Sequence, residues 1–200
     1  MKKVDRRVLR TRKAIVAAYL SLLKEKNIHS ISVSDITERA DINRATFYAH
    51  YENKQHLQEQ SINQVLVDLE DAIEVDQSGE RSADFNLQML HEVFERLFEN
   101  IYAHREFYSV MLGEHGPSLF AEGLQEVIQK YTKKGLKMAH TAEITLIVAE
   151  DIYLSYITSA QLGVINYWRK HDFQQSPTFM AEQLLTLYKL GGAKIADYKR

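Results

Sequence analysis

Apolar residues recur every three or four positions along most of this chain, which is the spacing of one face of an α-helix. The first such stripe predicts a helix from about Thr11 to Lys26, and its apolar members are Ile15, Tyr19, Leu22 and Leu23. Only 2 Pro and 8 Gly interrupt the 200 residues, and β-type alternation is absent over any useful length. The pattern therefore predicts an all-α fold.

Two short helices around a tight turn are predicted between residues 32 and 50. Ser32 and Asp35 form an S-x-x-D start signal, in which a hydroxyl and a carboxylate satisfy free amide groups at a helix N-terminus. The helical pattern breaks at residues 41–43, where Asp and Asn both tolerate turn geometry. Asn43 then caps a second helix, which begins at Arg44 and reaches His50. Two helices joined this tightly are typical of a helix-turn-helix.

In such a motif the second helix enters the major groove of DNA with its N-terminal residues toward the base edges. Phe47 is expected to face inward, and Arg44 either reads guanine or, as the more common kind of contact, holds a phosphate. Lys54 begins a third helix, capped by Asn53, whose positive end favours an anion, so a phosphate contact is predicted there too. Helix pairs of this kind also serve structural roles, which keeps that alternative open. The residues expected to contact DNA are Ser32, Ser34, Asn43, Arg44, Thr46, Tyr48, His50, Tyr51, Lys54, Arg10 and Arg12.

Charge is distributed unevenly along the chain. Residues 1–57 hold 12 Lys and Arg against 6 Asp and Glu, whereas residues 58–200 hold 13 against 21. DNA binding needs a local positive potential rather than a positive net charge over the whole chain, and the N-terminal part supplies this potential. The cations before the first apolar helix predict an arm along phosphates or in a minor groove, with a solubilising tail as the alternative. They are Lys2, Lys3, Arg6, Arg7, Arg10, Arg12 and Lys13.

Residues 8 to 57 resemble the DNA-binding signature of the TetR family of bacterial regulators. The matching positions are Ser32-x-x-Asp35-Ile36, Arg39-Ala40, Ile42-Asn43 and Thr46-Phe47-Tyr48-x-His50-Tyr51-x-x-Lys54-x-x-Leu57. One departure is Asp41, which stands where the family usually has Gly and which can adopt a left-handed backbone at modest cost. Asn43 likewise replaces a common Ser with another good cap. The resemblance implies a regulator, most simply a repressor, that binds a near-palindromic operator in double-stranded DNA and is released by a small effector.

The rest of the chain reads as a larger helical domain. The helix from Lys54 runs to an acidic stretch near Asp76, and further helices are predicted near 82–102, 104–112, 118–138, 142–169 and 177–190. Residues 113–117 form a clear break, and Ser176-Pro177 is a capped helix start. We therefore expect about nine helices, in a DNA-binding domain over 1–57 that continues into a ligand-binding and dimerisation domain over 58–200.

The last two predicted helices carry more apolar and small residues than one side of a small domain needs. A homodimer is predicted, in agreement with the resemblance, because TetR-family members pair through their last two long helices. The alternative is burial inside one subunit, which would account for about half of these positions. The residues expected at the interface are Leu154, Ile157, Gln161, Leu162, Ile165, Trp168, Leu184 and Leu187.

Aromatic and methionine side chains gather in the middle of the C-terminal half and suit an apolar pocket with a few polar groups. Residues of these types at helical spacing are more often ordinary core, so each position is a candidate only. The resemblance implies a small apolar or amphipathic effector. The candidates for its pocket are Tyr102, Phe107, Tyr108, Met111, Tyr131, Met138, Tyr153 and Tyr156.

No catalytic motif is recognisable: G-x-S-x-G, a Gly-rich phosphate loop and H-E-x-x-H are all absent from the sequence. We expect no enzymatic activity, no cofactor and no metal site, since His91 with Glu92 and Glu95 reads as a solvated helix face. The chain has no cysteine and no signal-like or membrane-spanning run, so a cytoplasmic protein without membrane partners is expected. Two other functions stay open: a co-activator that binds a protein through its C-terminal domain, and a helical carrier of small molecules.

Overall fold

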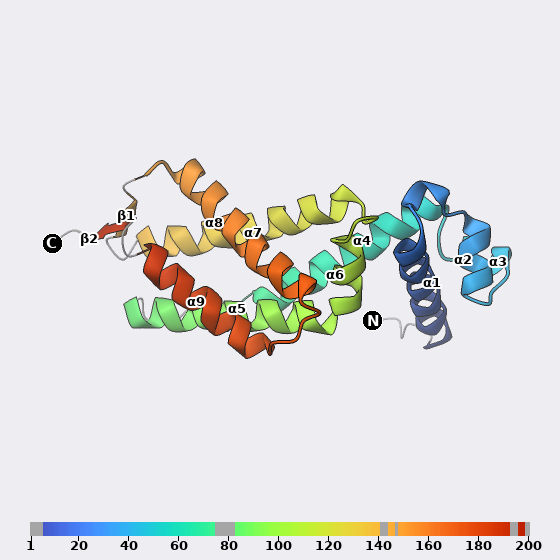
Figure 1. Cartoon of the computed structure of the whole chain (residues 1–200), viewed down its shortest axis with the longest axis horizontal. Helices are drawn as coiled ribbons and strands as arrows, with labels where there is room; N and C mark the ends of the chain where they lie inside the picture. Colours follow the sequence, from blue (N-terminus) through green and yellow to red (C-terminus); the bar gives the residue numbers. More distant parts are fainter. Residues whose placement is uncertain (1–5, 75–82, 141–143, 147, 193–195, 199–200) are drawn as a thin grey trace. The chain divides into compact units, whose positions relative to one another are not determined.

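A computed structural model describes residues 6–74, 83–140, 144–146, 148–192 and 196–198. The described residues form nine α-helices, one 3-10 turn and two short strands, so the predicted all-helical fold is confirmed (Figure 1). In chain order they are α1 (Arg6–Glu25), η1 (Ile28–Ser30), α2 (Val33–Arg39), α3 (Arg44–Tyr48), α4 (Lys54–Ile73), α5 (Ala83–Ala103), α6 (Arg105–Met111), α7 (Ser118–His140), β1 (Ile144–Leu146), α8 (Glu150–Lys170), α9 (Pro177–Gly192) and β2 (Ala196–Tyr198).

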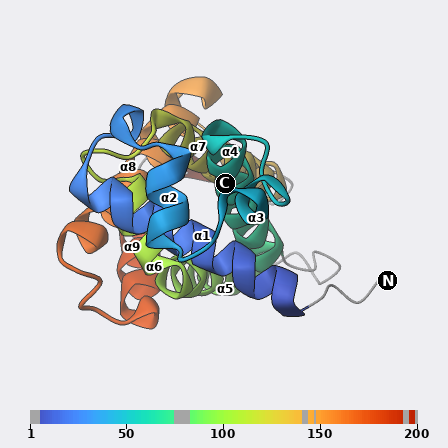
Figure 2. The same ribbon diagram turned by 90° about the vertical axis from the view of Figure 1, so that its right-hand side faces the viewer.

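The chain divides into two compact units, and the first contains residues 1–65 together with 106–120. Here α2 packs against both α1 and α3, which are drawn in blue in Figures 1 and 2. The predicted stripe of α1 is confirmed, because its four apolar side chains are all buried. Phe107 and Tyr108 of α6 pack edge-on against Phe120, with ring centroids 5.2 and 5.1 Å away. Burial of these stripes and rings holds the unit together.

The second unit contains residues 66–105 and 121–200, and in it α9 lies along α5 (Figure 1). Trp168 of α8 is fully buried between Phe98, Tyr102 and Phe173, at ring-centroid distances of 5.4, 6.0 and 5.1 Å. Its indole Nε1 donates to the carbonyl of Gln175 at 3.1 Å, which ties the end of α8 to the turn before α9. This tryptophan is therefore a centre of the second core.

Helix ends with local signals lie where the sequence places them. The break at residues 113–117 separates α6 from α7, and α9 begins at Pro177 with the amide of Phe179 donating to Ser176 Oγ at 3.2 Å. The turn between α2 and α3 also follows the sequence, because Asp41 adopts the left-handed backbone with φ 51°. These features depend on neighbouring residues alone, which is why sequence patterns predict them.

Two expectations about the elements are wrong. The helix expected over 142–169 begins only at Glu150, because Ile144–Leu146 forms strand β1, paired antiparallel with β2. β-Branched residues favour this extended pairing, and its partner strand lies fifty residues later, beyond the reach of local patterns. Helix α1 begins at Arg6 rather than near Thr11. Among the residues searched, no helix is long and apolar enough to cross a membrane.

Candidate nucleic-acid interface and C-terminal cavities

The two helices of the helix-turn-helix are capped by their own side chains. Ser32 and Asp35 form a reciprocal capping box: the amide of Asp35 donates to Ser32 Oγ at 3.2 Å, and the amide of Ser32 donates to Asp35 Oδ2 at 2.7 Å. These bonds, with Lys26 nearby, lower the pKa of the Asp35 carboxyl to about 2. Asn43 Oδ1 accepts from the amide of Thr46 at 2.7 Å and from its hydroxyl at 2.9 Å. The predicted caps are confirmed, and they orient α3.

Helix α3 has one buried and one exposed face. Phe47 is fully buried, as predicted, whereas Tyr48 is 55% exposed and Arg44 is also exposed. Arg44 donates to Ser34 Oγ, a contact that steadies the guanidinium across α2 and α3 and occupies one of its five donors. The exposed face therefore presents an arginine fork and a tyrosine side by side, with Asn43 exposed at the helix start.

Arg39 makes a different kind of contact. Its guanidinium forms two hydrogen bonds to the Glu25 carboxylate, both 2.8 Å, and a further bond to Ser21 Oγ at 2.5 Å. The bidentate contact lowers the pKa of Glu25 and raises that of Arg39. The Arg39 side chain therefore ties α2 to α1.

Lys54 does not project as a free phosphate clamp. Its ammonium donates to the backbone carbonyls of Ile28 and Ile31 at 2.6 and 2.7 Å, so it ties the start of α4 to turn η1. Partial burial lowers its pKa. The phosphate contact stays a prediction that would have to use the third ammonium proton, since two of its three donors are used inside the protein.

Tyr51 is also a core residue. It is only 4% exposed and lies against Phe47, with ring centroids 5.8 Å apart, and burial raises its pKa. Its side chain therefore offers little surface to DNA. His50 beside it is half-buried.

The basic residues before α1 do not all form an arm. Arg10 and Arg12 are exposed on α1 itself, because that helix begins at Arg6. Helical backbone places these guanidinium groups at fixed positions instead of along an extended segment. Lys2 and Lys3 lie outside the described residues.

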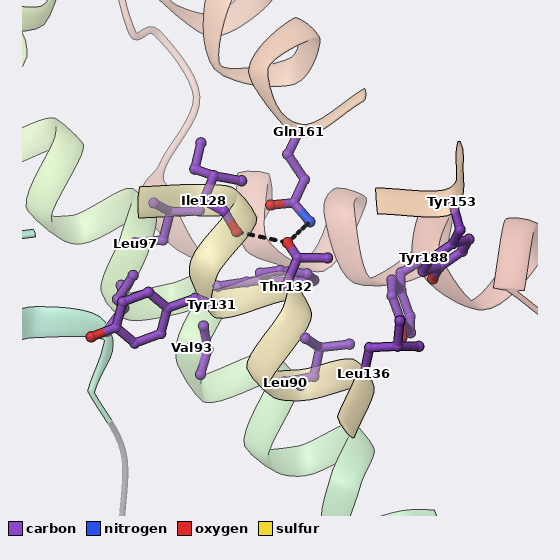
Figure 3. Close-up of a pocket in the computed structure, with 13 residues that line it drawn as sticks. Leu90, Val93, Leu97, Ile128, Tyr131, Thr132, Leu136, Tyr153, Gln161 and Tyr188 are labelled. Atoms are coloured by element: carbon purple, nitrogen blue, oxygen red, sulfur yellow. Dashed lines mark hydrogen bonds between the residues drawn. The ribbon is translucent and has the colours of Figure 1, made fainter. Parts of the chain in front are cut away.

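Two cavities lie in the second unit, with volumes of about 60 and 140 Å³. Tyr131 and Tyr153 line the smaller one (Figure 3), and Tyr153 and Tyr156 line the larger. The other lining residues include Phe94, Gln161 and Tyr188, and nothing in the sequence singled these out for a pocket. Their convergence comes from the packing of α5, α8 and α9.

The other pocket candidates lie elsewhere. Phe107, Tyr108 and Met111 are buried in the core of the first unit and line neither of these two cavities. Tyr102 stacks on Trp168 with Arg105 over its ring. The Met138 side chain lies outside the described residues. Aromatic composition therefore did not separate core residues from cavity residues, because both environments favour large apolar side chains.

The residues expected at a dimer interface fall into two groups. Leu154, Gln161, Ile165, Trp168 and Leu184 are buried within the chain, so a partner has no access to them in this conformation. Ile157 and Leu162 are half-buried, and Leu187 is 55% exposed. For the five buried positions the interface assignment is corrected to core. The exposed apolar side chains of the same two helices are Ile152, Tyr156, Tyr167, Phe179, Leu187 and Leu190.

A capped helix pair that displays Arg44 and Tyr48 opposite a buried Phe47, joined to a helical second unit, defines a helix-turn-helix transcription regulator. Comparison with known proteins gives the family. Residues 15–60 match "Bacterial regulatory proteins, tetR family", and residues 88–189 match a TetR "Transcriptional regulator C-terminal region". The chain belongs to the TetR family, which consists of DNA-binding regulators.

Relatives and solved structures agree with this assignment. The chain is 28% identical over 190 residues to YxbF, an HTH-type transcriptional regulator of Bacillus subtilis strain 168, covering 92% of this chain but 46% of YxbF. It is 43% identical over 47 residues to DhaS, the dhaKLM operon transcriptional activator of Lactococcus lactis, covering 24% of this chain and 25% of DhaS. The chain thus spans about half or less of the length of these two relatives. A TetR regulator structure from Streptococcus agalactiae shares the fold, with TM-score 0.62 at 20% identity over 92% of this chain and 96% of that one.

Proposed function

We propose that this protein is a repressor that binds a near-palindromic operator as a homodimer and releases it when an effector fills the C-terminal unit. The observation that carries the DNA-binding part is the exposed pair Arg44 and Tyr48 on a helix locked by its own caps. Asn43, Thr46, Ser34 and the α1 arginines extend this surface. Such a protein acts where the chromosome lies, in the bacterial cytoplasm.

Dimerisation is supported by the exposed side of α8. Ile152 and Tyr156 are 67% and 57% exposed and lie one turn apart, and the small residues Ser159 and Gly163 follow on the exposed surface. A Cβ added at Gly163 would meet nothing within 4 Å, so there is room for a close partner. On α9, Leu187 is 55% exposed and adds an apolar side chain to this surface. A two-fold pairing of these helices would present two α3 helices to half-sites about 34 Å apart.

Effector response is supported by the contacts between α4 and the cavity wall. Ile73 of α4 lines the smaller cavity, and the Tyr131 hydroxyl from α7 donates to Glu74 Oε2 at 2.7 Å. Lys130 pairs with Glu70 at 2.8 Å, and Lys134 pairs with Glu74. Because α4 is one continuous helix from Lys54 to Ile73, a molecule that shifts Tyr131 acts on the helix that also enters the DNA-binding unit.

Selection of bound fragments from the source genome at physiological salt tests DNA recognition. The Arg44→Ala, Tyr48→Ala double variant should lose the selected operator while keeping its helical content, because both side chains are on the exposed face. Lys133→Ala removes an exposed cation from α7 of the other unit and should keep full binding. Unchanged retention by the double variant would refute the recognition surface.

Sedimentation tests the dimer. Ile152→Asp places a charge on the proposed interface without entering the core, and it should shift the protein toward monomer and weaken operator binding. A dimer of unchanged stability would refute this interface. Reporter expression with and without the gene shows whether the protein represses or activates transcription. This measurement is needed because the relative DhaS is named an activator.

A further inference from the structure

The two cavities of the second unit share a wall. Phe94, Tyr153, Gln161 and Tyr188 line both of them, so movement of these side chains would join the two spaces. The larger, of about 140 Å³, is close to the size of an apolar cavity of about 150 Å³ that accepts benzene. The larger cavity therefore has room for about one six-membered ring, and the exposed side chains of Tyr156 and Leu187 in its lining leave it partly open to solvent.

The lining of both cavities is uncharged. Among the described residues that form it, the side chains are aliphatic or aromatic apart from Gln161, Thr132 and the tyrosine hydroxyls. Burial raises the pKa of Tyr153, so this phenol stays neutral at physiological pH. A charged ligand would lose its hydration here and meet no charged side chain among the described lining residues.

Gln161 is the polar group with unused capacity. Its side chain is only 6% exposed, and its one hydrogen bond within the described part of the chain runs from Nε2 to Thr132 Oγ1 at 3.5 Å (Figure 3). That hydroxyl already donates its own proton to the carbonyl of Ile128 at 2.8 Å. A bond of 3.5 Å is weak, and a buried amide offers two donors and a carbonyl acceptor.

We propose that these cavities bind an uncharged molecule of about one ring in size that carries a single hydroxyl or carbonyl group. The ring occupies the space beside Val164 and Ile157, and the polar group replaces the long contact of Gln161 with a shorter bond. This inference rests on the proposed effector response, whose ligand class it names. The proposed ligand class excludes carboxylates and ammonium ions, whereas an amphipathic effector in general could carry either charge.

Three molecules of the same ring size test the charge rule on the wild-type protein. Benzyl alcohol, benzoate and benzylamine are titrated separately at pH 7, with binding followed by calorimetry and by the rise in melting temperature. Benzyl alcohol should bind at least about tenfold more tightly than either ion, since each ion must give up its hydration. Equal or tighter binding of benzoate or benzylamine would overturn the proposal.

Two variants test the location. Gln161→Leu keeps the volume and removes the amide, so it should weaken benzyl alcohol about tenfold and leave toluene nearly unchanged. Val164→Phe fills the larger cavity and should abolish binding of both molecules. Leu190→Ala, exposed on α9 and away from the lining, is the control and should change neither. If Gln161→Leu and Val164→Phe bind both probes like the wild type, the assigned site is wrong.

Operator release separates this inference from the function on which it rests. Benzyl alcohol at saturating concentration should lower retention of the selected genomic fragment, and benzoate at the same concentration should not. If no fragment is ever retained, the regulator proposal fails while the binding preference stands. If fragments are retained but benzoate binds better, only the ligand class fails.

Discussion

Replacing Lys54 by Met distinguishes a structural cation from a phosphate clamp. The ammonium donates to Ile28 and Ile31 carbonyls at 2.6 and 2.7 Å, and Ile31 itself is buried. Hydrogen bonds to charged groups contribute about 1.5–3 kcal/mol each when well shielded. Lys54 is only partly buried, so we expect the pair together to contribute about 2 kcal/mol, taken near the lower limit.

The variant should therefore unfold about 4–8 °C lower than the wild type, at about 2–4 °C per kcal/mol for a chain of this length. Urea unfolding followed by circular dichroism gives the free energy, and hydrogen exchange should show faster exchange in η1. Lys24→Met removes an exposed cation from a 2.8 Å surface pair with Glu106 and is the matched control, with an expected loss of about 0.5 kcal/mol or less.

The salt dependence of operator binding decides between the two roles. Removing a phosphate contact lowers the slope of log affinity against log salt by about 1. The structure predicts that Lys54→Met leaves this slope nearly unchanged in the folded protein. Wild-type stability together with a slope reduced by about 1 would refute the structural role and restore the clamp.

Other substitutions test local features of the fold. Asp41→Gly should raise the melting temperature slightly, because glycine adopts φ 51° without the cost of about 1 kcal/mol that an L side chain meets there; a lower value would contradict this. Gly116→Ala should destabilise by about 1–3 kcal/mol, because its Cβ would clash with the backbone carbonyl oxygen of Met111. Gly135→Ala, with open space on helix α7, should stabilise by up to about 1 kcal/mol, and equal effects of the two changes would show that the clash is relieved freely. The lowered pKa of Asp35, about 2 against 3.8, means that its contribution is complete above pH 4 and is lost as the pH falls toward 2. In urea titrations the destabilisation by Asp35→Asn should therefore shrink below pH 4, and a constant difference between pH 3 and 7 would argue against the capping box.

Local chemistry explains why so much of the DNA-binding unit is readable in the sequence. The Ser32 and Asp35 box, the Asn43 cap and the left-handed Asp41 involve residues at most three apart, and all of them lie as predicted. The buried Phe47 follows from helical spacing alone. The apolar pattern and the capping residues identify such a helix pair because both depend on residues that are close in the chain.

Sequence patterns do not predict contacts between residues that lie far apart in the chain. A lysine at a helix start has the same local signal whether it meets a phosphate or, like Lys54, two carbonyls more than twenty residues earlier. Trp168 shows the same limit, because an apolar helix face does not reveal whether its own subunit or a partner covers it. Residues 106–120 join the first unit although the sequence suggests a later domain for them.

The sequence alone determined the helices, their caps, the basic N-terminal part and the family resemblance, since each depends on composition or on residues close in the chain. Only the tertiary structure decided which candidates are surface, core or cavity: Tyr51 became core, Lys54 an internal tie, and Gln161 a cavity residue. The physical reason is that burial and hydrogen-bond partners are set by segments distant in sequence, whose approach no single stretch encodes.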